Sequence, residues 1–249
     1  MNGGDAPKPA IPSDELRGAI VVITGVGRRG QAGEVVAGEF ARQGATLILV
    51  DRDMDSVSER ASDLSIHGTQ IHPFACDLTD ARAVGELMEK VAAVALEGVT
   101  AVVHMAGGYV EGATVSATDP STWHKLFAIN LTTAFMATRA FLPLVRRARG
   151  SMVYFASAAA LPGAGVAKMS AYAAAKSGVI TLMRAVAAEE KSNGVRANAI
   201  APQAIRTTEN LSSMGEDHPY VERETVAAWV LWLCSRLAGP VSGQVIRLG

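Results

Sequence analysis

The chain of 249 residues lacks the patterns that mark several classes of protein. It has only two cysteines, Cys76 and Cys234, both in apolar stretches, where a small buried thiol is more common than a disulfide. Neither has metal-ligand spacing, and no Cys, Asp or Glu is convincingly spaced for a metal site with His67, His72 or His124. We therefore expect neither a disulfide framework nor a metal site.

Charge of one sign is not concentrated anywhere in the sequence. The formal net charge is -1, and there is no dense block of lysine and arginine, so we expect no nucleic-acid partner. No apolar run approaches the roughly 20 residues that span a bilayer. The first residues also lack the apolar core of a signal peptide. We expect a cytoplasmic protein without membrane association.

Short apolar runs alternate with longer segments of helical period. Apolar residues make up 49% of the chain, which is enough for a sizeable core. The runs are AIVVIT, ATLILV, TQIHPFA, VTAVVHMA, GSMVYFAS, GVRANAIA and GQVIRL, and segments such as AGEVVAGEFARQ lie between them. Strands that are apolar on both sides and separated by helices predict a doubly wound, seven-stranded parallel α/β sheet with helices on both faces, a Rossmann fold.

The chain divides into a short arm and one domain. Residues 1–18 are rich in glycine, proline and charge and have no periodicity, which predicts a flexible N-terminal arm. Residues 19–249 contain no domain boundary, internal repeat or low-complexity tract, so we expect a single domain. Ligands of such sheets bind beyond the carboxyl ends of the strands, and the residues after each apolar run are therefore the candidates for a site.

A glycine-rich loop, TGVGRRGQAG, follows the first apolar run. Its glycines allow a sharp turn and close approach to a phosphate, and the following helix start offers free N–H groups. A tight strand-to-helix turn without a ligand is the alternative. Asp51, 18 residues beyond Gly33, follows the second run, where a carboxylate can accept hydrogen bonds from the adenosine ribose. Together they favour a dinucleotide site that includes Gly25, Gly27, Gly30 and Gly33.

The third and fourth apolar runs end in further candidates. Asp77 and Leu78, in CDLTD, could lie beside the adenine, but an aspartate before a helix is equally well explained as an N-cap or turn residue. In HMAGG, Ala106 and Gly107 permit close approach of a flat ligand. We interpret His104 as a core or strand-end histidine.

A possible acid/base group follows the fifth apolar run, which ends at Ser157. Fifteen residues later, YAAAK places Tyr172 and Lys176 on one face of a predicted helix. A phenol with a pKa of about 10 is a poor base at neutral pH, and an adjacent ammonium favours the phenolate and lowers that pKa. Such a tyrosine can exchange a proton with a substrate oxygen. An incidental helical pair is the alternative for this motif alone.

These motifs stand in the order found in the classical short-chain dehydrogenase/reductase family, which the sequence resembles from about Ala19 to its end. LFAINLTTAF is similar to the helix that carries the family's active-site asparagine, here Asn130, and NAIAP and VSGQVIRLG are further matches. The resemblance implies an NAD(P)-dependent oxidoreductase that transfers a hydride between a nicotinamide cofactor and an alcohol or carbonyl substrate. It also implies a homodimer or homotetramer.

The resemblance assigns roles to individual residues. Tyr172 is the general acid/base, and Ser157 hydrogen-bonds the substrate oxygen. Lys176 binds the nicotinamide ribose and lowers the pKa of Tyr172, and Asn130 holds a water that links Lys176 to solvent. These roles suit hydride transfer, which builds charge on an oxygen and needs one proton. The implied cofactor contacts are the loop glycines, Arg28, Asp51, Arg52, Asp77, Leu78, Ala106, Gly107, Tyr172, Lys176 and Pro202.

The sequence departs from the family pattern at several positions. The family's T-G-x-x-x-G-x-G reads T-G-x-x-x-x-G-x-x-G here, with two extra residues between Gly25 and Gly33. Residues 104–107 read HMAG in place of N-N-A-G, and residues 202–203 read PQ in place of P-G. The stretch 157–172 is about two residues longer than usual, and the lid segment 205–220 is shorter. The alternative function is a dinucleotide-binding regulatory or scaffolding protein with little turnover.

The cofactor preference depends on Asp51 and on three nearby arginines. A carboxylate at the end of the second strand would repel a 2'-phosphate, so we expect NAD rather than NADP. Arg28, Arg29 and Arg52 could instead pair with that phosphate. We give Asp51 more weight, because the strand fixes its position.

The segment SAYAAAKSGVITLMRAVAAEE predicts an interface between helices. It is small or apolar around most of its circumference, and such a helix needs cover on more than the sheet side. We therefore expect a homo-oligomer, with loops of the same chain as the alternative cover. The residues that would let another helix approach closely are Ala171, Ala174, Ala175 and Gly178.

Overall fold

Seven parallel strands form the central sheet of the computed structural model, which describes residues 8–110 and 112–249. The strand order is β3-β2-β1-β4-β5-β6-β9, so the direction of winding reverses between β1 and β4. The predicted doubly wound parallel α/β sheet is confirmed. The strands in this order are β3 (Ile71–Ala75), β2 (Thr46–Asp51), β1 (Ile20–Thr24), β4 (Ala101–His104), β5 (Ser151–Phe155), β6 (Arg196–Pro202) and β9 (Val245–Leu248).

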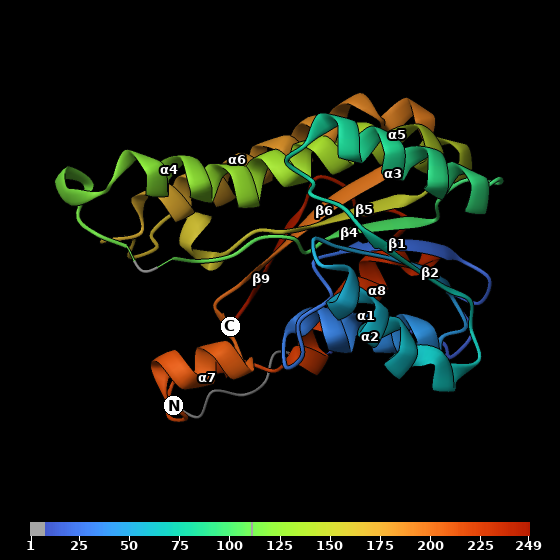
Figure 1. Ribbon diagram of the computed structural model, residues 1–249, viewed down its shortest axis with the longest axis horizontal. Helices are drawn as coiled ribbons and strands as arrows, with labels where there is room; N and C mark the ends of the chain where they lie inside the picture. The colour runs from blue at the N-terminus through green and yellow to red at the C-terminus, as the bar shows by residue number, and fades with distance from the viewer. Residues whose placement is uncertain (1–7, 111) are drawn as a thin grey trace.

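Helices cover both faces of this sheet (Figure 1). One face carries α1 (Ala32–Arg42), α2 (Met54–Leu64) and α8 (Arg223–Cys234). The other carries α3 (Ala81–Val94), α5 (Thr133–Ala148) and α6 (Ser170–Glu189). α4 (Pro120–Phe127) extends this second layer and packs against α6. Two smaller elements lie outside the layers: α7 (Thr208–Met214), and a two-stranded parallel sheet of β7 (Ala204–Ile205) and β8 (Tyr220–Val221).

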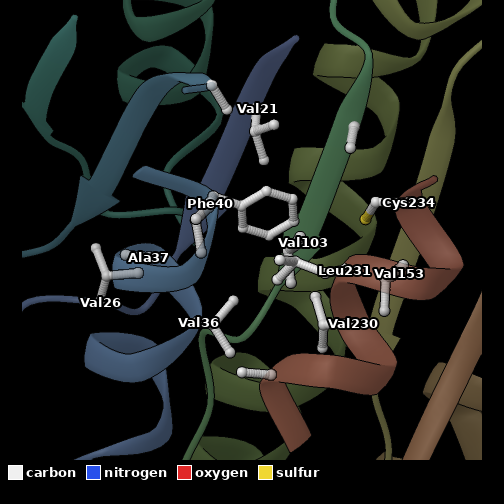
Figure 2. Close-up of a cluster of buried hydrophobic side chains, with 14 of the residues drawn as sticks. Val21, Val26, Val36, Ala37, Phe40, Val103, Val153, Val230, Leu231 and Cys234 are labelled. Atoms are coloured by element: carbon white, nitrogen blue, oxygen red, sulfur yellow. The ribbon is translucent and has the colours of Figure 1, made fainter. Parts of the chain in front are cut away.

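The strands are apolar throughout because both of their faces are buried. In β1, Val21 and Ile23 face the α1 and α8 side, while Val22 packs into the core on the other side. Figure 2 shows the ring of Phe40, on α1, lying against the strands near Val103, with residues of α8 alongside. A parallel sheet covered on both faces needs this composition, and it explains why the strand positions were readable from the sequence.

Part of the segment predicted to be a flexible arm packs on the domain. Leu16 is only 2% exposed and belongs to the core beneath α1 and α8. Glu15 accepts hydrogen bonds from the backbone and the guanidinium of Arg236, at 2.9 to 3.2 Å. These contacts tie residues 15–16 to the end of α8, whereas residues 1–7 of the predicted arm lie outside the described residues.

A helical segment from Pro120 to Ala148 is long and apolar enough, by length and composition, to cross a membrane. This is weak evidence for a membrane span, because core helices of soluble proteins pass the same test. Within this segment, 44% of the most apolar window is buried in the protein. The large apolar side chains of this segment that are exposed are Trp123 and Phe135.

Candidate active site

Two positions in the loop after β1 leave no room for a side chain. Gly25 has a φ of +77°, and a Cβ there would lie 2.7 Å from the backbone of Ala106. A Cβ at Gly33, in the first turn of α1, would lie 2.8 Å from the carbonyl oxygen of Gly25. Glycine at these positions lets the loop, the end of β4 and the start of α1 approach closely.

The enlarged part of the loop contacts α7. Gly30 has a φ of +72°, and a Cβ there would lie 2.0 Å from the hydroxyl oxygen of Thr208. The backbone N–H of Thr208 donates to the carbonyl of Gly30 at 3.1 Å. Arg28 adds an exposed ion pair with Glu209 at 3.2 Å. The enlarged loop is therefore directly connected to the lid segment.

The start of α1 fits the pyrophosphate of a dinucleotide. The helix begins just after the loop, and its N-cap residue, Gln31, makes no side-chain cap, so the first-turn N–H groups can bind an anion. Two other amides of the loop are already engaged. Gly27 N donates to Asp51 at 2.8 Å, and Gly30 N donates to Glu34 at 2.6 Å. The phosphate donors are therefore expected on the first turn of α1 and not at these two glycines.

Asp51 lies where the sequence predicts, at the end of β2. Its Oδ2 accepts the hydrogen bond from Gly27, and its Oδ1 accepts one from the backbone of Arg52 at 2.7 Å. These contacts fix the carboxylate beside the glycine loop, and each oxygen retains a lone pair for a ribose hydroxyl. The side chain of Arg52 is exposed and makes no hydrogen bond within the described part of the chain.

The two arginines of the enlarged loop are paired with carboxylates. Arg28 binds Glu209, on α7. Arg29 lies 2.8 Å from Glu59 and 3.1 Å from Asp63, both on α2. These exposed ion pairs are individually weak, but they direct both guanidinium groups toward acidic side chains.

Asp77 takes the role of a turn residue in this structure. Its carboxylate accepts from the backbone N–H of Thr79 at 2.9 Å and from the Thr79 hydroxyl at 2.7 Å. These bonds lower the pKa of Asp77. Leu78 is 6% exposed and packs in the core, while Asp80 provides the N-cap of α3.

The remaining predicted cofactor contacts lie at the carboxyl ends of β4 and β6. The backbone N–H of Ala106 donates to the Thr24 hydroxyl at 3.2 Å, which ties the end of β4 to that of β1. Pro202 is the last residue of β6 and pairs with Leu248, on β9. Both therefore lie at the edge of the sheet where the glycine loop begins.

Asn130 lies in a π-helical turn, Ala128–Thr132, between α4 and α5. Such turns often occur at functional sites. The side chain is 1% exposed, and its Nδ2 donates to the carbonyls of Gly108 and Leu126, each at 2.9 Å. Its Oδ1 accepts from Gly108 N at 3.1 Å. Asn130 thereby fastens the loop after β4 to the helical layer.

Lys176 is buried beside this asparagine. Its Nζ donates to the carbonyl of Phe155 at 2.8 Å, and burial lowers its pKa to about 8. A Cβ at Gly107 would lie 2.6 Å from Oδ1 of Asn130 and 3.3 Å from Nζ of Lys176. The residues predicted from separate motifs after β4, before α5 and in α6 are thus in contact.

Tyr172 and Lys176 differ from the expectation in their electrostatics. The ammonium lies 5.9 Å from the centroid of the Tyr172 ring. Burial raises the pKa of Tyr172, while a hydrogen bond with the Ser157 hydroxyl partly lowers it. The expectation that Lys176 lowers this pKa is wrong for this structure, because the ammonium points to a backbone carbonyl and burial disfavours the phenolate.

A small cavity adjoins Tyr172, with a volume of about 150 Å³. The ring of Tyr109 packs edge-on against that of Tyr172, with the centroids 5.3 Å apart. Sequence reasoning missed Tyr109, although it directly follows the glycines after β4. Gly112 and Lys168 also line it, and they lie so close together that a Cβ at Gly112 would be 1.5 Å from the carbonyl oxygen of Lys168. Its apolar wall includes Val110, Ala113, Leu126 and Met169.

His104 is a core residue, as interpreted from the sequence. Its ring packs on that of Tyr154 at 4.7 Å, and its Nε2 lies 3.5 Å from the Thr138 hydroxyl. Burial lowers its pKa to about 3, so the imidazole is neutral at physiological pH. Among the described residues, no group of three or more His, Cys, Asp or Glu could hold a metal ion.

The small residues of α6 are covered in part by the chain itself. A Cβ at Gly178 would lie 2.7 Å from the side chain of Leu131, in the π-helical turn. Ala171 and Ala175 are 4% and 0% exposed. At Gly178 the close approach is therefore used within the chain, by a helical turn and not by a loop.

A known family matches this arrangement. The family model described as short chain dehydrogenase matches residues 19–218, and the chain therefore belongs to the short-chain dehydrogenase/reductase family. It is thus an oxidoreductase of Rossmann fold that uses a nicotinamide cofactor.

Individual relatives agree with this assignment. The chain is 32% identical over 197 residues to 2-(S)-hydroxypropyl-CoM dehydrogenase 3 of Xanthobacter autotrophicus, covering 79% of this chain and 75% of that protein. It is 34% identical over 191 residues to a protein of the same organism named inactive 2-(S)-hydroxypropyl-CoM dehydrogenase 2, covering 76% and 80%. A short-chain dehydrogenase from Escherichia coli, solved as a complex with NADPH, superposes with a TM-score of 0.86 at 28% identity, covering 95% and 99%.

The buried ammonium predicts a pH-dependent stability. Because the pKa of Lys176 is about 8 in the folded protein and near its ordinary 10.5 in the unfolded chain, the unfolded chain binds more protons between these values. Stability should therefore rise with pH in this window. We expect the free energy of unfolding of the wild type, measured relative to Lys176→Met, to increase by about 2 kcal/mol from about pH 7 to about pH 10.

Urea titrations of the two proteins at each pH measure this difference. Tyrosines and cysteines shared by both proteins cancel in the comparison, so only the lysine contributes. A difference that stays constant over the window would contradict the depressed pKa of Lys176.

Proposed function

We propose that this protein transfers a hydride between NAD and an alcohol or carbonyl substrate, with Tyr172 as the general acid/base. The observation that carries the proposal is the grouping of Tyr172, Ser157 and Lys176 next to a small cavity and beside Gly107, after β4. The cofactor, when bound, supplies or accepts the hydride. The protein must then place one proton and stabilise the charge that develops on the substrate oxygen.

Ser157 and Tyr172 support both tasks. The Oγ of Ser157 accepts a hydrogen bond from Ala159 N at 3.2 Å, and its hydroxyl is hydrogen-bonded to Tyr172. When a substrate binds, the same hydroxyl can donate its proton to the substrate oxygen instead. Because its pKa is raised, Tyr172 keeps its proton at neutral pH and can donate it to the developing alkoxide. In the oxidative direction Tyr172 must first lose its proton, and the phenolate oxygen then takes the proton from the alcohol.

Lys176 and Asn130 complete the proposed site. The bond to Phe155 uses one N–H of Lys176, and its other N–H groups can bind ribose hydroxyls of the nicotinamide nucleotide. Both N–H groups of Asn130 are occupied by backbone carbonyls. A water in a relay to Lys176 would therefore bind the remaining lone pair of Oδ1 on Asn130.

The preference for NAD is supported by the charges around the adenosine end of the site. Asp51 is held at the end of β2, and Arg28 and Arg29 are paired with carboxylates, so neither is directed at a 2'-phosphate. Solved relatives from Escherichia coli and Shigella flexneri bind NADPH and NADP, respectively. The preference for NAD is therefore proposed for this chain only and not for the whole family.

A regulatory or scaffolding role is the second candidate. It is favoured by the engagement of the Gly27 and Gly30 amides within the protein and by the relative that is named inactive. The two candidates differ in turnover and not in cofactor binding. A protein that binds NAD but turns over none of a broad panel of alcohols and ketones would support the second.

Tyr172→Phe tests the proposed chemistry. Removal of the hydroxyl should lower kcat at least about a hundredfold, the scale of lost general acid/base catalysis, while the Kd for NAD stays within about threefold. Calorimetry and steady-state kinetics on the best substrate of the panel measure both. Tyr154→Phe is a matched control, because the Tyr154 hydroxyl bonds that of Thr138 in the core, away from the cavity. Near-normal turnover by folded Tyr172→Phe would remove this residue from the mechanism.

Asp51→Ala tests the cofactor preference. The wild type should bind NAD more tightly than NADP at fixed ionic strength, and the substitution should lower the ratio of the two affinities by about tenfold as the repulsion of the 2'-phosphate is lost. Asp53→Ala is the control, since this neighbouring carboxylate caps α2. Tighter NADP binding by the wild type would contradict the preference, and an unchanged ratio in Asp51→Ala would show that this carboxylate does not set it.

We also propose that the protein is a cytoplasmic homodimer or homotetramer. Phe135 is 48% exposed and Trp123 is 39% exposed on the apolar helical segment 120–148, and burial against a second copy would cover them. Light scattering at micromolar concentration should give a mass of two or four chains. Phe135→Glu should reduce that mass, whereas Leu96→Glu, at an apolar residue that is 69% exposed outside this segment, should not. A monomeric wild type would refute the proposal.

A further inference from the structure

A buried arginine lies beneath the glycine loop. Arg60, on α2, is 2% exposed, and its Nη1 lies 3.0 Å from Asp63 and 3.4 Å from Glu34. Its Nε donates to the carbonyl of Val26 at 3.4 Å. A buried guanidinium requires several partners to offset the loss of water. Here two carboxylates and a carbonyl of the loop provide them.

Glu34 extends this contact into the enlarged part of the loop. One of its carboxylate oxygens faces Arg60, and the other accepts the hydrogen bond from Gly30 N at 2.6 Å. Arg223, at the start of α8, lies 3.6 Å from the same carboxylate. The contacts therefore link α2, the first turn of α1, the loop and α8.

The loop needs such support because it is long and its own side chains are exposed. The side chains of Arg28 and Arg29 are 65% and 59% exposed, so neither anchors the loop in the core. A longer loop also has more conformations to restrict. Arg60 holds it at Val26 and, through Glu34, at Gly30. Val26 and Gly30 both precede the first turn of α1, which is proposed to bind the pyrophosphate.

We propose that Arg60 is a positioning residue for the cofactor: it fixes the enlarged loop through Val26 and Glu34, so that the first turn of α1 presents its N–H groups to the pyrophosphate. The inference rests on the proposed function, since it concerns the same cofactor site. It assigns no contact between Arg60 and the cofactor. Arg60 affects cofactor binding only through its contacts with the loop.

Arg60→Met removes the charge and keeps a long, largely apolar side chain. The Kd for NAD and the KM for NAD should rise about tenfold or more, because the loop is no longer held in the binding conformation. The kcat at saturating NAD should stay within about threefold, since Tyr172, Ser157 and Lys176 lie at the other end of the cofactor. Arg42→Met is the matched control. Arg42 pairs with Glu39 on the exposed side of α1 and does not touch the loop.

A second variant separates positioning from stability. Loss of Arg60 removes the nearer of the two guanidinium groups that face the half-buried carboxylate of Glu34. Glu34→Gln in the Arg60→Met background removes the carboxylate charge while keeping an oxygen for Gly30 N. The double variant should recover at least threefold of the lost NAD affinity. A merely structural role for Arg60 would lower Tm and leave the Kd of the folded protein unchanged. Where Arg60→Met does not fold, Arg60→Lys, which cannot reach all three partners, carries the same test.

Calorimetry with NAD and with NADP distinguishes the possible failures. A wild type that binds neither dinucleotide would refute the proposed function, and the inference with it. A wild type that binds NAD while folded Arg60→Met, or Arg60→Lys in its place, binds it equally well would refute the inference alone. A rise in Kd that also appears in Arg42→Met would point to a general loss of charge and would likewise refute it.

Discussion

The structure depends on one constraint, the burial of a parallel sheet on both faces. Parallel strands require crossover connections, and the helices that make them here cover both faces and leave only the strand ends accessible. The carboxyl ends of all seven strands meet at one edge. The winding reverses there between β1 and β4, which is where ligands of doubly wound sheets bind. The glycine loop, Asp51 and Ser157 are brought together by this topology.

A second requirement follows at this edge, where polar groups are buried and must satisfy one another. The ammonium of Lys176 bonds a strand carbonyl, Asn130 bonds the backbone of the loop after β4, and Arg60 bonds the backbone of the loop after β1. Each buried side chain thereby immobilises a segment of backbone. Held groups of this kind need little rearrangement when charge develops, which is how fixed dipoles favour a reaction.

Much of this arrangement could be predicted from the sequence, because it follows from the periodicity of the apolar residues and from the order of the motifs. The apolar runs mark strands buried on two sides, and Asp51 lies directly after one of them. The electrostatics were not readable, since the pKa of Tyr172 depends on burial and on where the ammonium of Lys176 points. The segments that pack against α6 could not be predicted either. Small residues indicate that another segment approaches closely, but they do not identify that segment. For Gly178 the neighbour is Leu131 of the same chain.

The enlarged loop shows how one departure from the family pattern changes contacts with neighbouring elements. Two extra residues give the loop new backbone polar groups, and Gly30 has both of its groups bonded, the N–H to Glu34 and the carbonyl to Thr208. The first bond requires a carboxylate close to a helix start that is suited to anions, and the nearby guanidinium of Arg60 offsets that negative charge. The second bond ties the loop to α7. The longer loop and the lid segment are therefore in direct contact, and the loop supplies part of the support of α7.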